Sequence, residues 1–114
     1  MPMKLVIREY LSADGRSFFR EWLDGLDISV RARIQARVLR FEMGNLGDHK
    51  SVGGGVWEAR ITFGPGYRIY FGKEGAAVIL LLLGGDKSSQ ASDIREARHL
   101  WKDYLRTRRH GKTQ

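Results

Sequence analysis

The sequence predicts an α+β domain in which helices pack on one face of an antiparallel sheet. Residues 56–63 and 67–71 alternate apolar and polar side chains, as strands do, and a Gly-Pro-Gly turn at 64–66 joins them into a hairpin. Three other segments repeat apolar residues every three or four positions, which is typical of amphipathic helices. The expected order is β-α-α-β-β-β-α, in a single domain over residues 1–114.

The N-terminal part of the chain is expected to supply one strand and two helices. Residues 3–10 form the strand, because Met3, Leu5 and Ile7 share one face at period two. Apolar residues at helical spacing follow over 18–26. They recur over 30–41, where Asp27 is the expected N-cap and glycines at 44 and 47 end the helix.

The C-terminal part is expected to supply the remaining strands and the last helix. Residues 78–83 are apolar on both sides, which indicates a central strand covered on both faces. Residues 89–108 carry an apolar stripe at helical spacing and form the expected last helix. The basic segment at about 107–114 is expected to form a tail without fixed structure.

Composition narrows the classes of function. Lys and Arg total 20 against 13 acidic residues, a net charge of +7 that favours a polyanionic partner such as nucleic acid. The absence of cysteine excludes disulfides and thiol catalysis. His49, His99 and His110 lack the spacing of metal ligands, so we expect neither metal nor cofactor.

Nothing in the sequence suggests a membrane or secreted protein. The longest apolar run, residues 76–83, is far shorter than the roughly 20 residues of a membrane-spanning helix. The first residues lack the apolar core and small-residue cleavage site of a secretory signal. We therefore expect a soluble, cytoplasmic protein.

The polar face of the predicted hairpin is a candidate active site. If Phe63 pairs with Tyr67 across the turn, Arg60 faces Tyr70, and the apolar side chains turn toward the helices. Four polar side chains then share the open face: Glu58, Arg60, Arg68 and Tyr70.

These residue types suit cleavage of a phosphodiester. Arginine binds phosphate through two parallel hydrogen bonds, a glutamate accepts a proton, and a tyrosine stacks on a base or donates to phosphate. Sheet faces also carry solvated Arg–Glu ladders, so a surface ion pair between Glu58 and Arg60 explains the same pattern.

Other basic residues are candidate RNA contacts, because they cluster on the second helix, before the hairpin and on the last helix. They are Arg33, Arg37, Arg40, Lys50, Arg98 and Lys102. Solvated helix faces account for the helical clusters equally well. The glycine run at 53–55 lacks the Lys-Ser/Thr of a phosphate-binding loop, so we expect an ordinary loop.

Several motifs, taken in order, resemble one family. They are GVWEARI at 55–61, GPGYRIY at 64–70 and LLLGGDKSSQ at 81–90, with further matches at 19–23, 44–48 and 93–101. They resemble the phage-related addiction module killer proteins, a branch of the RelE/ParE toxin superfamily close to the HigB-type toxins. The resemblance covers most of the chain and implies a RelE-like fold.

The resemblance implies the toxin of a type II toxin–antitoxin pair, held in a hetero-oligomer by a protein antitoxin that often has a helix-turn-helix fold. RelE-like toxins cleave mRNA on the ribosome with basic residues. Arg60 and Arg68 match two strand arginines of the family, and Lys87 matches the basic residue after the last strand. The tyrosine that RelE-type enzymes carry shortly afterwards is missing, and Tyr70 is a candidate substitute.

The leading hypothesis is therefore a ribosome-dependent, metal-independent mRNA endoribonuclease. Arg60 and Arg68 would hold the phosphate, Lys87 would add charge or a proton, Tyr70 would position a base or phosphate, and Glu58 would act as general base or orient Arg60. Two alternatives remain open. One is a ParE-like toxin that poisons gyrase without cutting RNA, and the other is an inactive toxin that only binds its partner.

Overall fold

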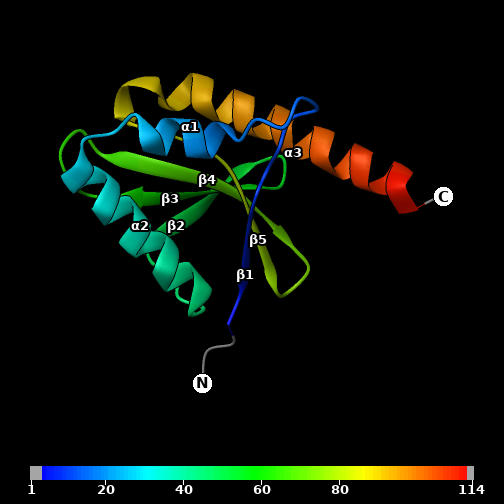
Figure 1. The fold of residues 1–114 in the computed structure, drawn as a ribbon, viewed down its shortest axis with the longest axis horizontal. Helices are drawn as coiled ribbons and strands as arrows, with labels where there is room; N and C mark the ends of the chain where they lie inside the picture. The colour runs from blue at the N-terminus through cyan, green and yellow to red at the C-terminus, as the bar shows by residue number, and fades with distance from the viewer. Residues whose placement is uncertain (1–3, 113–114) are drawn as a thin grey trace.

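The computed structural model describes residues 4–112, with side chains described as far as Arg108. Figure 1 shows the elements, which in chain order are β1 (Val6–Glu9), α1 (Phe18–Asp24), α2 (Ile28–Glu42), β2 (His49–Gly53), β3 (Val56–Ile61), β4 (Tyr67–Glu74), β5 (Val78–Gly85), a short 3-10 turn η1 (Lys87–Ser89) and α3 (Gln90–Lys112). The protein is an α+β protein, as predicted.

The sheet is mixed rather than antiparallel. Its strand order is β1-β5-β4-β3-β2, with β1 parallel to β5 and every other pair antiparallel. The antiparallel prediction was wrong because it considered only strands joined by turns, whereas Val6 pairs with Val78, far along the chain. β2 was not predicted either, since it is short and three of its five residues are polar.

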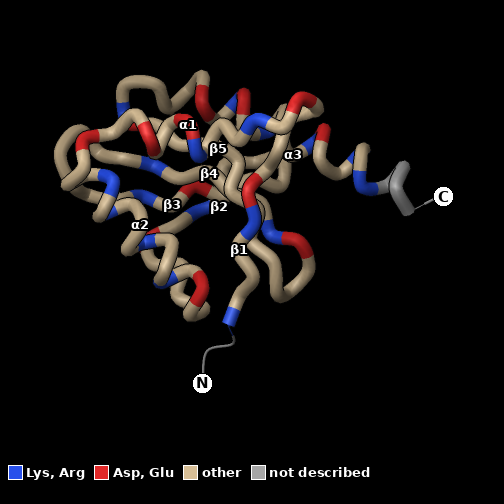
Figure 2. Tube along the Cα trace, viewed as in Figure 1, with Lys and Arg blue, Asp and Glu red and all other residues tan. Residues whose placement is uncertain are grey.

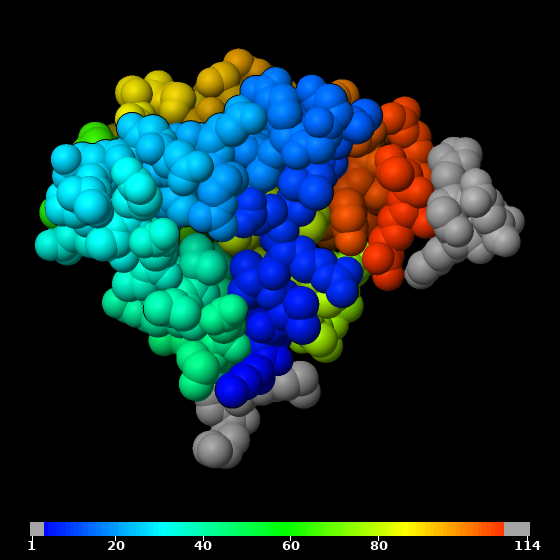
Figure 3. Space-filling model, in the orientation of Figure 1, coloured from blue at the N-terminus to red at the C-terminus, as the bar shows by residue number. Residues whose placement is uncertain are grey.

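Helices cover both faces of the sheet, so the prediction of helices on one face was also wrong. α1 and α2 pack on one face, through Phe19 and Ile34 among others, and α3 packs on the other through Ala97 and Trp101. Figure 3 shows the N-terminal segments, blue to cyan, across the front, with α3 emerging behind them. β5 is an inner strand between β1 and β4 and is covered on both faces, as its apolar sequence indicated, although β4 holds the central position of the sheet.

Two glycines allow tryptophans to approach the sheet closely from opposite sides. A Cβ at Gly72 would lie 2.3 Å from the ring of Trp101 on α3. A Cβ at Gly84 would lie 2.2 Å from the ring of Trp22 on α1. These distances are too short for any side chain, so glycine is required at both positions.

Local signals set the ends of the helices. Asp27 caps α2, as predicted, by accepting a hydrogen bond from Ser29 N at 3.1 Å. α3 continues to Lys112, so most of the segment expected as a tail is helical; residues 113–114, like Met3 of the predicted first strand, lie outside the described residues. Within the described part of the chain, no helix is long and apolar enough to cross a membrane.

Candidate functional site

The β3–β4 hairpin places the predicted polar residues on one face, but in a different register. Arg60 pairs with Arg68 and Glu58 with Tyr70, because the connection between the strands spans residues 62–66 rather than three residues. The predicted register was wrong by two positions. A shift of two keeps every side chain on its face, so the four residues still lie together.

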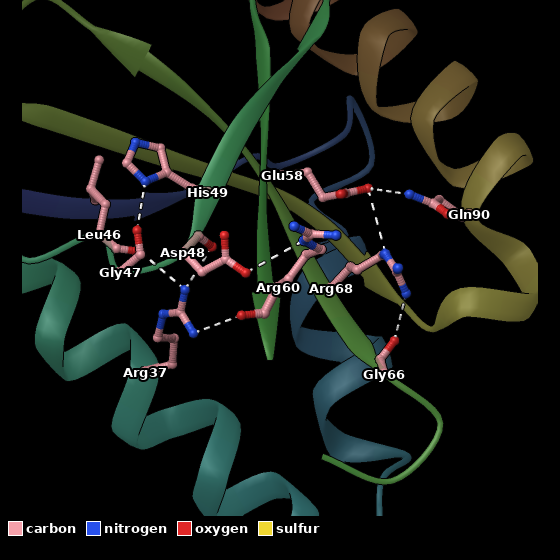
Figure 4. A network of polar contacts seen from close by, with 10 residues as sticks. All are labelled: Arg37, Leu46, Gly47, Asp48, His49, Glu58, Arg60, Gly66, Arg68 and Gln90. Carbon is pink, nitrogen blue, oxygen red and sulfur yellow. Dashed lines mark hydrogen bonds and ion pairs between the residues drawn. The ribbon is translucent and has the colours of Figure 1, made fainter. Parts of the chain in front are cut away.

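The expected open face is closed where Glu58 and Tyr70 lie. Both side chains have no exposed surface, because α3 covers this part of the sheet. Tyr70 Oη donates to Glu58 Oε2 at 3.1 Å. Gln90 Nε2, from the first turn of α3, donates to the same oxygen at 2.9 Å, as Figure 4 shows. Burial, and then the charge of Glu58, raise the pKa of Tyr70 above its usual range, so its phenol stays protonated.

Arg68 is held at the edge of this buried cluster. It is 7% exposed, its Nη1 donates to the Gly66 carbonyl at 2.8 Å, and its Nε lies 3.6 Å from Glu58 Oε2. Lys87, which is exposed, lies beside it: a Cβ at Gly66 would be 3.4 Å from Arg68 Nη1 and 3.9 Å from Lys87 Cβ. The guanidinium of Arg68 is thus held by Gly66 and Glu58, and Lys87 is an exposed basic residue near the same turn.

Arg60 is the accessible partner of the pair. Its side chain is 43% exposed, and its Nε lies 3.5 Å from Asp48 Oδ2. Lys50, exposed on β2, pairs with Glu58 and therefore lies on the same face as Arg60 and Arg68. Figure 2 shows the Lys and Arg positions along the neighbouring strands β2 and β3 in blue. We call this group the basic rim: Lys50, Arg60, Arg68 and Lys87.

Arg37 is a structural residue rather than part of a solvated helix face. It is 9% exposed, and its guanidinium donates to the backbone carbonyls of Arg60 (2.8 Å), Leu46 (3.2 Å) and Asp48 (2.9 Å). Gly47 lies against it, where a Cβ would be 2.7 Å from Nη2. Burial, and then the charge of Arg40, lower the pKa of Arg37. Its predicted role as an RNA contact does not fit this burial.

Arg33 and Arg40, by contrast, are exposed beside a cleft of about 420 Å³ between α2 and the end of β3. We call it the α2–β3 cleft; it is lined by Arg33, Ala36, Arg37, Arg40, Gly47, Asp48, Arg60, Ile61, Thr62 and Phe63. Arg33 Cζ lies 3.9 Å from the centre of the Phe63 ring. Asp48 and Arg60 line the cleft and form an ion pair, so the cleft adjoins the basic rim.

The other two predicted RNA contacts lie on α3, across the sheet from α2. Arg98 donates to the Val52 carbonyl and covers Gly53 and Gly54, so it ties α3 to the β2–β3 turn. Lys102 is exposed. The predicted set therefore does not form one surface. Among the described residues, no group of three or more His, Asp or Glu side chains is arranged to hold a metal.

Sequence reasoning missed Gln90, Asp48, Phe63 and Asp93. Gln90 and Asp93 belong to the turn that begins α3, and only the sheet beneath them reveals their contacts. A Cβ at Gly85 would overlap the carboxylate of Asp93, which also accepts from Ser89 Oγ at 2.5 Å. Burial raises the pKa of Asp93 above its usual range.

Comparison with known proteins finds a relative in Haemophilus influenzae. No family model matches the chain, and no solved structure matches it. A Haemophilus influenzae protein, described as uncharacterized, is 45% identical over 83 residues, which cover 72% of this chain and 84% of the relative.

Proposed function

The chain belongs to the same family as the Haemophilus influenzae protein, and we propose that it is an RNA-cleaving toxin of the RelE/ParE type. The observation that carries the proposal is the pairing of Arg60 with Arg68, with Lys87 beside Arg68 at the end of β5. Three basic residues thus lie at the neighbouring ends of β3, β4 and β5, and two of them, Arg60 and Lys87, are exposed. Such a cluster fits a phosphodiester better than it fits an uncharged ligand.

The chemistry is transesterification within RNA. A ribose 2′-oxygen attacks the adjacent phosphorus and loses its proton to solvent, and the bond from phosphorus to the 5′-oxygen breaks. The products are a 2′,3′-cyclic phosphate and a 5′-hydroxyl. Arg60 stabilises the negative charge that builds on the phosphate oxygens, and Lys87 donates a proton to the leaving 5′-oxygen.

Arg68 and Glu58, which are buried, assist this step without acting as acid or base. Gly66 and Glu58 hold the guanidinium of Arg68 in place, and in this proposal Arg68 adds positive charge next to its strand partner Arg60. Glu58 has no exposed surface, so in this proposal it orients Arg68 and does not act as the general base. Tyr70 donates to Glu58 and is equally buried, so it is a positioning residue and not a stacking platform.

The wider assignment rests on the motif resemblance. The element order matches the RelE-like order apart from β2, and this supports a RelE-like topology. We propose that the protein acts in the cytoplasm on mRNA at the ribosome. A cognate antitoxin of helix-turn-helix type would bind the basic rim and inhibit the protein. The charge of +7 is consistent with both the ribosome and an acidic antitoxin as partners.

Primer extension on a reporter mRNA during induced expression tests the proposal. Cuts within the translated region are expected for the wild type and for Arg95→Ala, an exposed arginine on α3, and not for Arg60→Ala. Growth arrest with intact mRNA would overturn the proposal in favour of gyrase or another target. Normal growth, with retained binding of the antitoxin, would indicate an inactive toxin.

A further inference from the structure

The α2–β3 cleft has features of a nucleotide-binding site that the cleavage chemistry does not require. We propose that it holds one nucleotide of single-stranded RNA beside the cut, with the base stacked on Arg33 and the phosphate bound by Arg40 and Arg60. The choice of RNA rests on the proposed function, whereas the existence of the site rests on the cleft itself.

Arg33 provides the stacking platform. Its guanidinium lies 3.9 Å from the centre of the Phe63 ring, within the range of a cation–π contact. A guanidinium that lies over a ring on one side is proposed to offer its other side to a nucleobase, and RNA-binding proteins stack bases on arginine planes in this way. An arginine on a merely solvated helix face would have no ring beneath it.

The shape of the cleft fits a single base. Its volume is about 420 Å³, and the small side chain of Ala36 lies one turn after Arg33 and one turn before Arg40 on α2. The cleft floor is cross-linked, because the buried Arg37 ties α2 to one backbone carbonyl of β3 and two of the loop between α2 and β2. A preformed site of this kind binds its ligand without the entropic cost of ordering its own residues.

Asp48 acts in this proposal as an internal competitor for the phosphate. It is the one carboxylate among the lining residues, against four arginines. Its side chain is 58% exposed and lies 3.5 Å from Arg60, and exposed ion pairs of this kind are weak. A phosphate that binds both Arg60 and Arg40 through charge-assisted hydrogen bonds is therefore expected to displace it.

The test measures binding of a fluorescent 2′-O-methyl octauridine, which is not cleaved because its 2′-oxygens are blocked. Ala36→Glu places a negative charge inside the cleft and is expected to weaken binding about tenfold. Ala32→Glu is the matched control, since Ala32 is exposed one turn earlier on α2 and does not line the cleft. It is expected to weaken binding less than about twofold, by the overall charge alone.

Asp48→Asn tests the competition. It keeps the backbone carbonyl that Arg37 contacts, removes the carboxylate beside Arg60, and is expected to tighten binding about threefold. Unchanged or weaker binding by this variant would overturn the role of Asp48.

The outcomes separate this inference from the proposed function. If Ala36→Glu and Ala32→Glu weaken oligonucleotide binding equally, the cleft is not the binding site, even if the protein cuts mRNA. A selective effect of Ala36→Glu would support the cleft, even if no cutting is found.

Discussion

Arg60 and Arg68 face each other across β3 and β4, yet their surroundings differ completely. Arg68 is 7% exposed and belongs to a buried cluster with Glu58, Tyr70 and Gln90. Arg60 is accessible, and its ion-pair partner Asp48 is more exposed still. A buried charge must be paired, whereas an exposed one is free to exchange its partner for a ligand.

The same contrast between a buried and an exposed arginine is found on α2. Arg37 donates to three backbone carbonyls, while Arg33 and Arg40, one turn before and after it, are exposed. Each region therefore has a fixed arginine beneath an accessible one. If the proposed function holds, Arg37 and Arg68 determine the shape of the site, and the exposed arginines are expected to contact the ligand.

Removal of Glu58 should have the largest effect on stability. Glu58→Ala leaves the buried guanidinium of Arg68 without its carboxylate, and breaking a buried pair costs about 3–5 kcal/mol in free energy of unfolding. Asp48→Ala breaks the exposed pair and should cost less than about 1 kcal/mol. Urea unfolding of both variants checks the difference, and equal losses would contradict the division into buried and exposed pairs.

Replacement of Arg37 should have the next largest effect. Arg37→Met keeps the length of the side chain but leaves three carbonyls without their donor, at a cost of about 3 kcal/mol. Arg40→Met, the matched change on the exposed side of α2, should alter the free energy of unfolding by less than about 0.5 kcal/mol. Similar values for the two, again from urea unfolding, would place Arg37 among the solvated residues.

The contrast also explains how far the sequence predicts the site. Alternation along β3 and β4 correctly placed Glu58, Arg60, Arg68 and Tyr70 on one face, because a register error of two does not change faces. It could not show that this face is covered, since nothing local to the hairpin reports where α3 packs. Burial of a polar residue is a tertiary property, so the open-face prediction failed at Glu58 and Tyr70 while Arg60 is accessible.

The fold divides in the same way. Segments with strong local periodicity, such as α2 and β5, were predicted correctly, and Asp27 was found as the cap of α2. The parallel pairing of β1 with β5 joins residues about 70 positions apart and has no local signature. The prediction of helices on one face conflicts with the sequence of β5, which is apolar on both sides and therefore indicates cover on both faces.

The alkaline stability of the protein should depend on Tyr70. Its pKa is raised in the folded state by burial and by Glu58, so above pH 10 the unfolded chain loses the phenol proton first. The unfolded state then binds fewer protons, and the free energy of unfolding falls as the pH rises, by at most about 1.4 kcal/mol per pH unit for one group. Tyr70→Phe should show a shallower fall between pH 10 and 11 in urea unfolding, with no change in slope near pH 7.

The smallest effect expected is on the salt dependence of RNA binding, and it distinguishes the exposed arginines from the fixed ones. A phosphate contact with single-stranded nucleic acid contributes about 0.7 to the slope of log K against log salt. Arg40→Gln should therefore reduce that slope by about 0.7 for 2′-O-methyl octauridine, because Arg40 is exposed in the cleft. Arg95→Gln, an exposed arginine of α3 on the other face of the sheet, should leave the slope unchanged. Equal reductions in both variants would mean that RNA senses only the net charge of the protein, and the division between fixed and ligand-binding arginines would then hold for stability but not for binding.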